Sequence, residues 1–173
     1  MRHLIAVIPV VFALALATGC KPTTPPAPSA AQPASVVRYS RDASFDNVVD
    51  DLQQAITAKG LVVDNVSHIG KMLERTGKDV GSTKPIFADG HAEAFSFCSA
   101  ALSRKTMEVD PHNVAFCPYT IVVYSPASEP KKVYVAYRRP VLNEGSDASR
   151  AVLKEVETLL DGIVREALRM PAS

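Results

Sequence analysis

Cys98 and Cys117 are the two residues of this 173-residue chain whose types and spacing most readily suggest chemistry. The only other cysteine is Cys20, so these are the only thiols beyond the first twenty residues. In an oxidising compartment, a bridge between them would close a loop of about 20 residues and stabilise the fold by roughly 3 kcal/mol. Cys98 also precedes a predicted helix, whose dipole favours a thiolate. Three states stay open: a structural disulfide, two free buried thiols, and a redox-active or ligand-binding pair.

Two histidines, His91 and His112, are candidate partners of these thiols. Two cysteines and two histidines can form a Cys₂His₂ metal site, and a cysteine beside a histidine can act as a nucleophile. The spacing matches no compact zinc finger or ribbon, and an isolated histidine on a loop is usually solvated. The sequence therefore predicts no cofactor, and a metal or haem site built on Cys98, Cys117 and these histidines is the alternative.

The composition narrows the class of protein. Hydrophobic residues make up 47% of the chain and 19 basic residues balance 18 acidic ones, which excludes a disordered protein. Because the charges balance, the chain lacks the net positive potential of a nucleic-acid binder. With 6% aromatic residues and no tryptophan, it also has few side chains on which bases could stack. No glycine-rich phosphate loop occurs. We expect a non-enzymatic binding or accessory module of unknown ligand rather than an enzyme; the alternative is a thiol-based redox or metal- or haem-handling protein.

The first nineteen residues have the pattern of a secretory signal peptide. A cationic start at Arg2 precedes an apolar run that is too short to cross a bilayer as a helix, and small residues follow it. The end of this segment, Leu16-Ala17-Thr18-Gly19-Cys20, resembles the lipobox of bacterial lipoproteins, in which the cysteine is acylated and becomes the mature N-terminus. The resemblance implies a bacterial envelope protein, anchored to the lipid bilayer through Cys20 and facing the periplasm. Lys21 after the cysteine favours the outer membrane over the inner one.

Residues 20–35 form a lipidated cysteine followed by a tether, and residues 36–170 form one domain. The tether is rich in proline and in small or polar residues, so it cannot bury a core and is expected to be an extended spacer. Regular hydrophobic patterns begin only at Val36. The domain is therefore held at a distance from the membrane.

Apolar periodicity and turn signals place the elements of this domain. Ser44 is expected to cap a helix that ends at Gly60, Ser99 to cap a short inserted helix, and Ser146 or Asp147 to cap a long terminal helix. Residues 70–85 read as a loop or a poorly ordered short helix, and as a candidate rim of a site. Strands are expected at 36–40, 61–66, 86–98 with an interruption at Asp89-Gly90, 119–124 with both faces covered, and 131–138.

This order predicts an α+β fold: a single domain with a curved, mainly antiparallel sheet packed against two main helices, and a short inserted helix. The apolar stripe of the terminal helix is expected to be core or the interface of a homodimer. Its polar face mixes acidic and basic residues and reads as solvated, as does the Arg138-Arg139 pair at the end of a strand.

The chain resembles the domain-of-unknown-function 302 family over roughly residues 36–140. The family's opening helix begins with a Ser-Phe-Asp-like motif, as at Ser44, and its centre has a cysteine, a helix, an Asp-Pro pair, a second cysteine and a buried strand. The matching residues here are Phe97-Cys98-Ser99-Ala100, Asp110-Pro111, Phe116-Cys117-Pro118 and Ile121-Val122-Val123-Tyr124. The resemblance implies a strand, a helix, four strands and a helix in a TATA-binding-protein-like sheet, often dimeric, with no established activity. Ser99-Ala100 stands where many members have Asn-Pro, which places the chain in a divergent exported branch.

Overall fold

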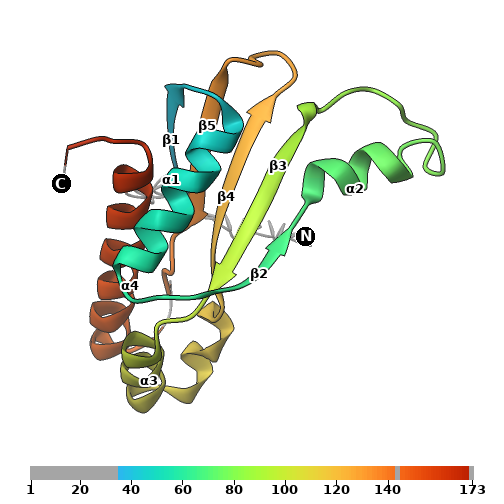
Figure 1. Cartoon of the computed structure of the whole chain (residues 1–173). Coiled ribbons are helices and arrows are strands. Elements are labelled where there is room, and N and C mark those ends of the chain that lie inside the picture. Colours follow the sequence, from blue (N-terminus) through green and yellow to red (C-terminus); the bar gives the residue numbers. More distant parts are fainter. Residues whose placement is uncertain (1–34, 143–144, 172–173) are drawn as a thin grey trace, which may run out of the picture. The chain divides into compact units, whose positions relative to one another are not determined.

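The structure is a computed structural model that describes residues 35–142 and 145–171 (Figure 1). The predicted signal peptide, Cys20 and all but the last residue of the predicted tether lie outside the described residues. Within the described part of the chain, no helix is long and apolar enough to cross a membrane.

The described residues form an α+β domain, as the sequence predicts. Five strands make one antiparallel sheet in the order β1-β5-β4-β3-β2, and helices pack against it (Figure 1). The strands are β1 (Val36–Asp42), β2 (Val63–Ser67), β3 (Phe87–Phe97), β4 (Tyr119–Pro126) and β5 (Lys132–Arg138). The helices are α1 (Phe45–Ala58), α2 (Ile69–Thr76), α3 (Ala100–Val109), the 3₁₀ helix η1 (Pro111–Phe116) and α4 (Asp147–Ala167).

The register of the strands builds one buried row of side chains across the sheet. Val37 pairs with Tyr137, Tyr137 with Ile121, and Ile121 with Phe95, and all four side chains are buried in the core with α1 and α4. The expectation that β4 is covered on both faces is wrong. Its side chains alternate between buried and half-buried, so only one face of this central strand is fully covered.

Serine side chains begin three of the four α-helices, as predicted. The hydroxyls of Ser44, Ser99 and Ser146 each accept a hydrogen bond from the backbone N–H three residues later. Such caps stabilise a helix by about 1 kcal/mol each. They fix where α1, α3 and α4 start, and therefore which side chains of α4 turn toward the sheet.

Residues 70–85 follow the second of the two predicted alternatives in part, because the short helix α2 extends to Thr76 before the chain turns irregular. Gly70 allows α2 to sit directly on β3: a Cβ at this position would lie 2.1 Å from the carbonyl oxygen of Gly90. The interruption expected at Asp89-Gly90 is confirmed, since both residues have positive φ and the register of β3 against β4 shifts there. The segment lines a small pocket of about 320 Å³.

Candidate functional site

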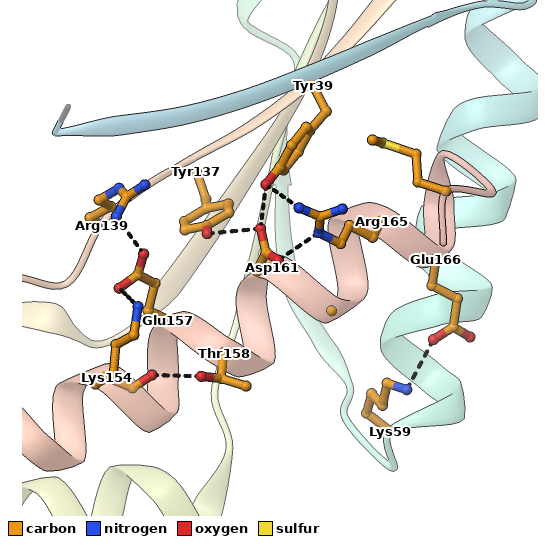
Figure 2. Close-up of a pocket in the computed structure, with 12 residues that line it drawn as sticks. Tyr39, Lys59, Tyr137, Arg139, Lys154, Glu157, Thr158, Asp161, Arg165 and Glu166 are labelled. Atoms are coloured by element: carbon orange, nitrogen blue, oxygen red, sulfur yellow. Dashed lines mark hydrogen bonds and ion pairs between the residues drawn. The ribbon is translucent and has the colours of Figure 1, made fainter. Parts of the chain in front are cut away.

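The largest cavity described lies between α4 and the β1–β5 side of the sheet, and we call it the α4 cleft (Figure 2). Its volume is about 640 Å³, within the range of small-molecule sites. Strands β1 and β5, the ends of α1 and α4, and one face of α4 contribute to its wall. The lining residues are Tyr39, Lys59, Tyr137, Arg139, Lys154, Glu157, Thr158, Asp161, Gly162, Arg165, Glu166 and Met170.

The spacing of polar residues along α4 places them on the cleft side. Glu157, Asp161 and Arg165 follow one another at four-residue intervals, so their side chains lie in one row along the helix. This row runs beside the buried apolar row that contains Val156 and Leu160. The same helix therefore contributes to the core and to the wall of the cleft.

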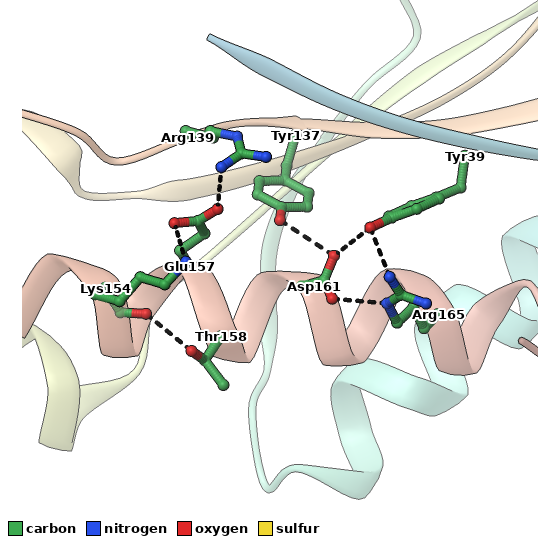
Figure 3. Close-up of polar contacts among 8 residues, drawn as sticks. All are labelled: Tyr39, Tyr137, Arg139, Lys154, Glu157, Thr158, Asp161 and Arg165. Atoms are coloured by element: carbon green, nitrogen blue, oxygen red, sulfur yellow. Dashed lines mark hydrogen bonds and ion pairs between the residues drawn. The ribbon is translucent and has the colours of Figure 1, made fainter. Parts of the chain in front are cut away.

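Asp161 is the centre of a hydrogen-bond network in the cleft (Figure 3). Tyr39 donates its hydroxyl hydrogen to Oδ1 of Asp161 at 2.8 Å, Tyr137 donates to the same oxygen at 3.3 Å, and Arg165 Nε donates to Oδ2 at 2.7 Å. Arg165 Nη2 also donates to the Tyr39 hydroxyl at 3.0 Å, and its guanidinium lies 4.8 Å from the centre of the Tyr39 ring. The network holds both phenol rings in defined positions at the wall of the cleft.

The two tyrosines are proton donors in this site and not bases. Burial, together with the nearby negative charge of Asp161, raises the pKa of Tyr137 far above its ordinary value. The pKa of Tyr39 is also raised, by burial and by its hydrogen bond to Asp161. Both hydroxyls therefore stay protonated at neutral pH and donate their single hydrogen to Asp161, an arrangement that suits a structural role in the wall better than nucleophilic or general-base catalysis.

Glu157 organises the other end of the cleft. Its side chain is nearly buried and accepts from Arg139 Nη1 at 2.8 Å and from Lys154 Nζ at 2.9 Å (Figure 2). The Nε atom of Arg139 is buried and has no hydrogen-bond partner in the described part of the molecule. Lys59 and Glu166 form a more exposed ion pair at 2.9 Å on the opposite side.

The cleft has more hydrogen-bond donors than its own carboxylates can use. Its lining contains four cationic side chains and three acidic ones. A guanidinium carries five N–H groups and an ammonium three, whereas each carboxylate here already accepts from an arginine or a lysine. The arrangement can therefore bind a molecule that supplies acceptor oxygens, and a negatively charged group most strongly.

The structure brings the two predicted thiols together. Phe97 pairs with Tyr119 where β3 and β4 meet, and Cys98 and Cys117 lie just beyond this pair. The Sγ atoms are 2.8 Å apart, at hydrogen-bond distance, and both residues are half-buried free cysteines. The hydroxyl of Ser103 lies 3.6 Å from Cys117 Sγ.

The expectation that the helix dipole favours a thiolate at Cys98 is wrong. Burial raises the pKa of the Cys98 thiol to about 12, and the hydrogen bond to Cys117 and the negative charge of Asp64 act in the same direction. Cys98 is therefore protonated at neutral pH and is not an activated nucleophile.

The predicted histidine partners do not join the thiols. His91 stacks on Phe45 at 4.4 Å between ring centres, seven residues before Cys98 on an extended strand, which corresponds to roughly 20 Å. His112 is exposed at the start of η1. Among the described residues, no group of three or more histidine, cysteine or acidic side chains is placed to hold a metal ion.

Sequence reasoning missed the residues of the α4 cleft. Arg139 was expected to be solvated at a strand end, and Glu157, Asp161 and Arg165 to be part of a solvated helix face; the structure places all four in the cleft. The usable signal was their four-residue spacing directly beside the apolar row of α4. The tyrosines of β1 and β5 gave no such signal, because alternation in a strand does not indicate what lies opposite.

Comparison with known proteins supports the fold and the family. The model of the family described as domain of unknown function DUF302 matches residues 36–167. A crystal structure from Bacillus stearothermophilus, described as an uncharacterized conserved protein DUF302, superposes with a TM-score of 0.63 at 12% identity, covering 77% of this chain and 98% of that chain. At this identity the likeness shows the fold alone, and no curated protein matches the chain. Because the family model covers well over half of its length, the chain belongs to the DUF302 family, as the motifs around Cys98 and Cys117 indicated.

Proposed function

We propose that this DUF302 protein is a lipid-anchored protein of the bacterial cell envelope whose α4 cleft binds a small organic anion without transforming it. The binding role is supported by the geometry of the cleft. The anchor and the periplasmic location are supported by the signal-like segment, the lipobox-like Gly19-Cys20 and the proline-rich tether that precede the domain.

The buried, unpartnered Nε of Arg139 is the observation that carries the binding proposal. A buried N–H without an acceptor costs roughly 1–3 kcal/mol, and a carboxylate or phosphate oxygen would recover this cost once the Arg139 side chain turned to present Nε to it. Glu157 holds the Arg139 guanidinium from one side only, through Nη1. Glu157 therefore satisfies only part of the guanidinium, and binding through Nε requires the Arg139 side chain to turn toward the ligand.

The other walls of the cleft indicate what the rest of the ligand is like. Tyr39 and Tyr137 offer phenol rings, and Met170 offers an apolar contact. A molecule with one acidic group and a partly apolar body would use both parts of the site. A bare inorganic ion would leave most of the 640 Å³ to water.

The binding proposal is tested with the purified full chain and matched pairs of small molecules. Calorimetry would compare carboxylates and phosphomonoesters of increasing size with the primary amides or alcohols of the same carbon skeleton. We expect an acid to bind at least about tenfold more tightly than its neutral partner, a difference of roughly 1.4 kcal/mol. Equal binding of acid and amide would contradict the anionic ligand, and absence of binding across the panel would contradict the site.

Two variants assign the binding to Arg139. Arg139→Gln removes the positive charge, and we expect it to weaken binding of the best acid by about tenfold or more. Arg104→Gln is the matched control, because Arg104 is exposed on α3 and pairs only with Glu108. If both variants bound the acid as the parent does, Arg139 would not be the anchor.

The anchor is tested by cell fractionation of the Cys20→Ser variant. We expect this variant to leave the membrane fraction, whereas Cys98→Ser stays membrane-bound. Separation of the two membranes by density then tests the outer-membrane assignment that Lys21 favours. Continued membrane association of Cys20→Ser after a salt wash would contradict a lipid anchor.

The thiol-based alternative has less support. A redox catalyst or a haem- or metal-handling site would need an activated thiol or nearby ligands, yet the pKa of Cys98 is raised and His91 lies far from it along β3. Homodimerisation of the domain remains a proposal, which light scattering of the purified protein tests directly.

A further inference from the structure

The chain between Cys98 and Cys117 leaves the sheet and returns to it at one point. It contains α3 and η1, and we call residues 98–117 the α3–η1 insertion (Figure 1). Phe97, immediately before the insertion, and Tyr119, two residues after Cys117, are paired across β3 and β4. The two cysteines therefore form the base of the insertion, held opposite each other by the register of the sheet.

The thiols are already positioned for a bond. Their sulfur atoms are 2.8 Å apart, less than 1 Å beyond the roughly 2.05 Å of a covalent S–S bond. The sheet fixes both ends of the insertion independently of the thiols. Bond formation therefore requires only a small side-chain movement and no rearrangement of the backbone pairing.

The surroundings of the two thiols favour a stable disulfide over one that exchanges readily with other thiols. Redox catalysts stabilise the thiolate of their active cysteine with nearby positive charge, which makes the disulfide easy to reduce. Here burial and the charge of Asp64 act against a thiolate at Cys98. The hydroxyl of Ser103, which lies beside Cys117 Sγ, and that of Tyr119, which bonds to Ser103, are neutral groups. A poorly stabilised thiolate is a poor leaving group, so the bridged form resists reduction by exchange.

We propose that Cys98 and Cys117 form a structural disulfide that closes the base of the α3–η1 insertion once the chain meets a disulfide oxidant. In the step, one thiolate attacks an external protein or glutathione disulfide and releases one thiol. The second thiolate then attacks the mixed disulfide and releases the other thiol. Two electrons pass to the external disulfide, and the two protons of the cysteines end on its thiols.

The proposed disulfide rests on the proposed export in one respect only, because export would bring the chain to a compartment that contains a disulfide oxidant. It is independent of ligand binding in the α4 cleft. The test therefore uses the purified full chain with oxidised glutathione. Trypsin cleaves after Arg104 and Lys105, both inside the insertion. The peptides that contain Cys98 and Cys117 consequently stay joined only if a bridge connects them.

We expect non-reducing peptide maps of the oxidised native protein to show these two peptides joined, with a mass two hydrogens below the sum of the free peptides. Cys98→Ser is expected to carry glutathione on Cys117 instead, because its resolving thiol is absent. Recovery of both peptides separately, each alkylated or each bearing glutathione, would overturn the proposal. Failure of Cys20→Ser to leave the membrane would not affect this result, so the two proposals fail separately.

A second measurement distinguishes a structural bridge from an incidental one. Closing a loop of this length is expected to raise the thermal midpoint of the oxidised protein by roughly 10 °C above that of the reduced protein. The double variant Cys98→Ala/Cys117→Ala is expected to melt at the same temperature with and without reductant. Equal midpoints for oxidised and reduced parent protein would show that the bond does not stabilise the fold.

Discussion

The α4 cleft and the α3–η1 insertion contact different parts of helix α4, and they differ in the kind of side-chain interaction that holds them there. The first turn of α4 holds the insertion through a neutral, buried hydrogen bond from Asn113 Nδ2 to Ser149 Oγ at 3.2 Å, while Asn113 Nδ2 also donates to the Thr106 carbonyl within the insertion at 2.9 Å. The exposed Lys105–Glu155 ion pair adds a weaker contact between α3 and α4. Later turns of α4 line the cleft with half-exposed charged groups. Asn113 and Ser149 are 2% and 0% exposed, whereas the side chains of Arg139 and Asp161 are 27% and 20% exposed.

This difference separates stability from binding along one helix. Groups removed from the insertion leave buried partners unsatisfied, so each change is costly. Groups removed from the cleft leave partners that water can reach, so the cost is smaller. The charged groups of the cleft also keep N–H donors for a ligand, which the neutral bonds of the insertion do not. Mutations in the two regions should therefore affect different measurements.

The largest effect on stability is expected from Asn113→Ala in the insertion. The variant removes both hydrogen bonds and leaves the Thr106 carbonyl and the Ser149 hydroxyl buried without this partner. We expect the free energy of unfolding to fall by about 2–3 kcal/mol in urea titrations, with binding in the cleft unchanged. His112→Ala, at the exposed neighbouring position, is the control and should cost less than about 0.5 kcal/mol. Equal stability of the two variants would remove the distinction between the regions.

Asp161→Asn tests the cleft side of the comparison and should cost less, about 1–2 kcal/mol. The amide can still accept from Tyr39 and Tyr137 but no longer forms the ion pair with Arg165. Because a negative charge leaves the wall, we expect organic acids to bind as tightly as before or more tightly. Glu155→Gln, in an exposed pair with Lys105, should change neither measurement appreciably. Loss of acid binding in Asp161→Asn would mean that the network, and not the excess of donors, determines affinity.

The two regions also differ in how far the sequence predicts them. The insertion could be predicted because cysteine is rare and Ser99 and Asp110-Pro111 mark the ends of α3 by local chemistry. Cys98 follows β3 and Cys117 precedes β4, and these two strands pair with each other in antiparallel orientation. The two cysteines therefore approach each other as the two ends of a hairpin connection do. The sequence could not predict the pKa of Cys98, since burial depends on the packed structure.

The cleft could not be predicted in the same way. Tyr39 and Tyr137 become neighbours only because the first and last strands of the chain, β1 and β5, pair with each other. Asp161 reaches both of them only because of the rotation of α4 on the sheet. Tyrosine, aspartate and arginine are common on solvated surfaces, so their types alone gave no reason to place them together. Non-local pairing was the missing information.

Lowering the pH should destabilise the region held by ion pairs before it destabilises the α3–η1 insertion. Asp51 on α1 provides the test with the smallest expected effect on the free energy of unfolding. Arg169, beyond the end of α4, donates to Asp51 at 3.1 and 3.2 Å, and Arg41 of β1 donates at 2.6 Å. These arginines, Arg169 foremost, hold the pKa of the Asp51 carboxyl below its ordinary value. The ionised carboxylate therefore stabilises the folded state above the unfolded pKa of about 4, and this contribution disappears as the pH falls through the lower folded value.

Asp51→Asn removes this contribution at every pH, so the difference between parent and variant reports it directly. At neutral pH we expect the variant to unfold about 1 kcal/mol more easily in urea, and we expect the two curves to converge below about pH 4. Asp50→Asn, on the exposed neighbouring residue, should match the parent at both ends of the pH range. In hydrogen exchange, the acid-dependent loss should be larger at the end of α4 than in α3, because the Lys105–Glu155 pair that joins α3 to α4 is exposed and contributes little, whereas the Asp51 side chain is only 18% exposed. If the difference in unfolding free energy between parent and Asp51→Asn stayed the same at acid pH, Asp51 would act by packing and not by charge. The contrast between the two ends of α4 would then rest on burial alone.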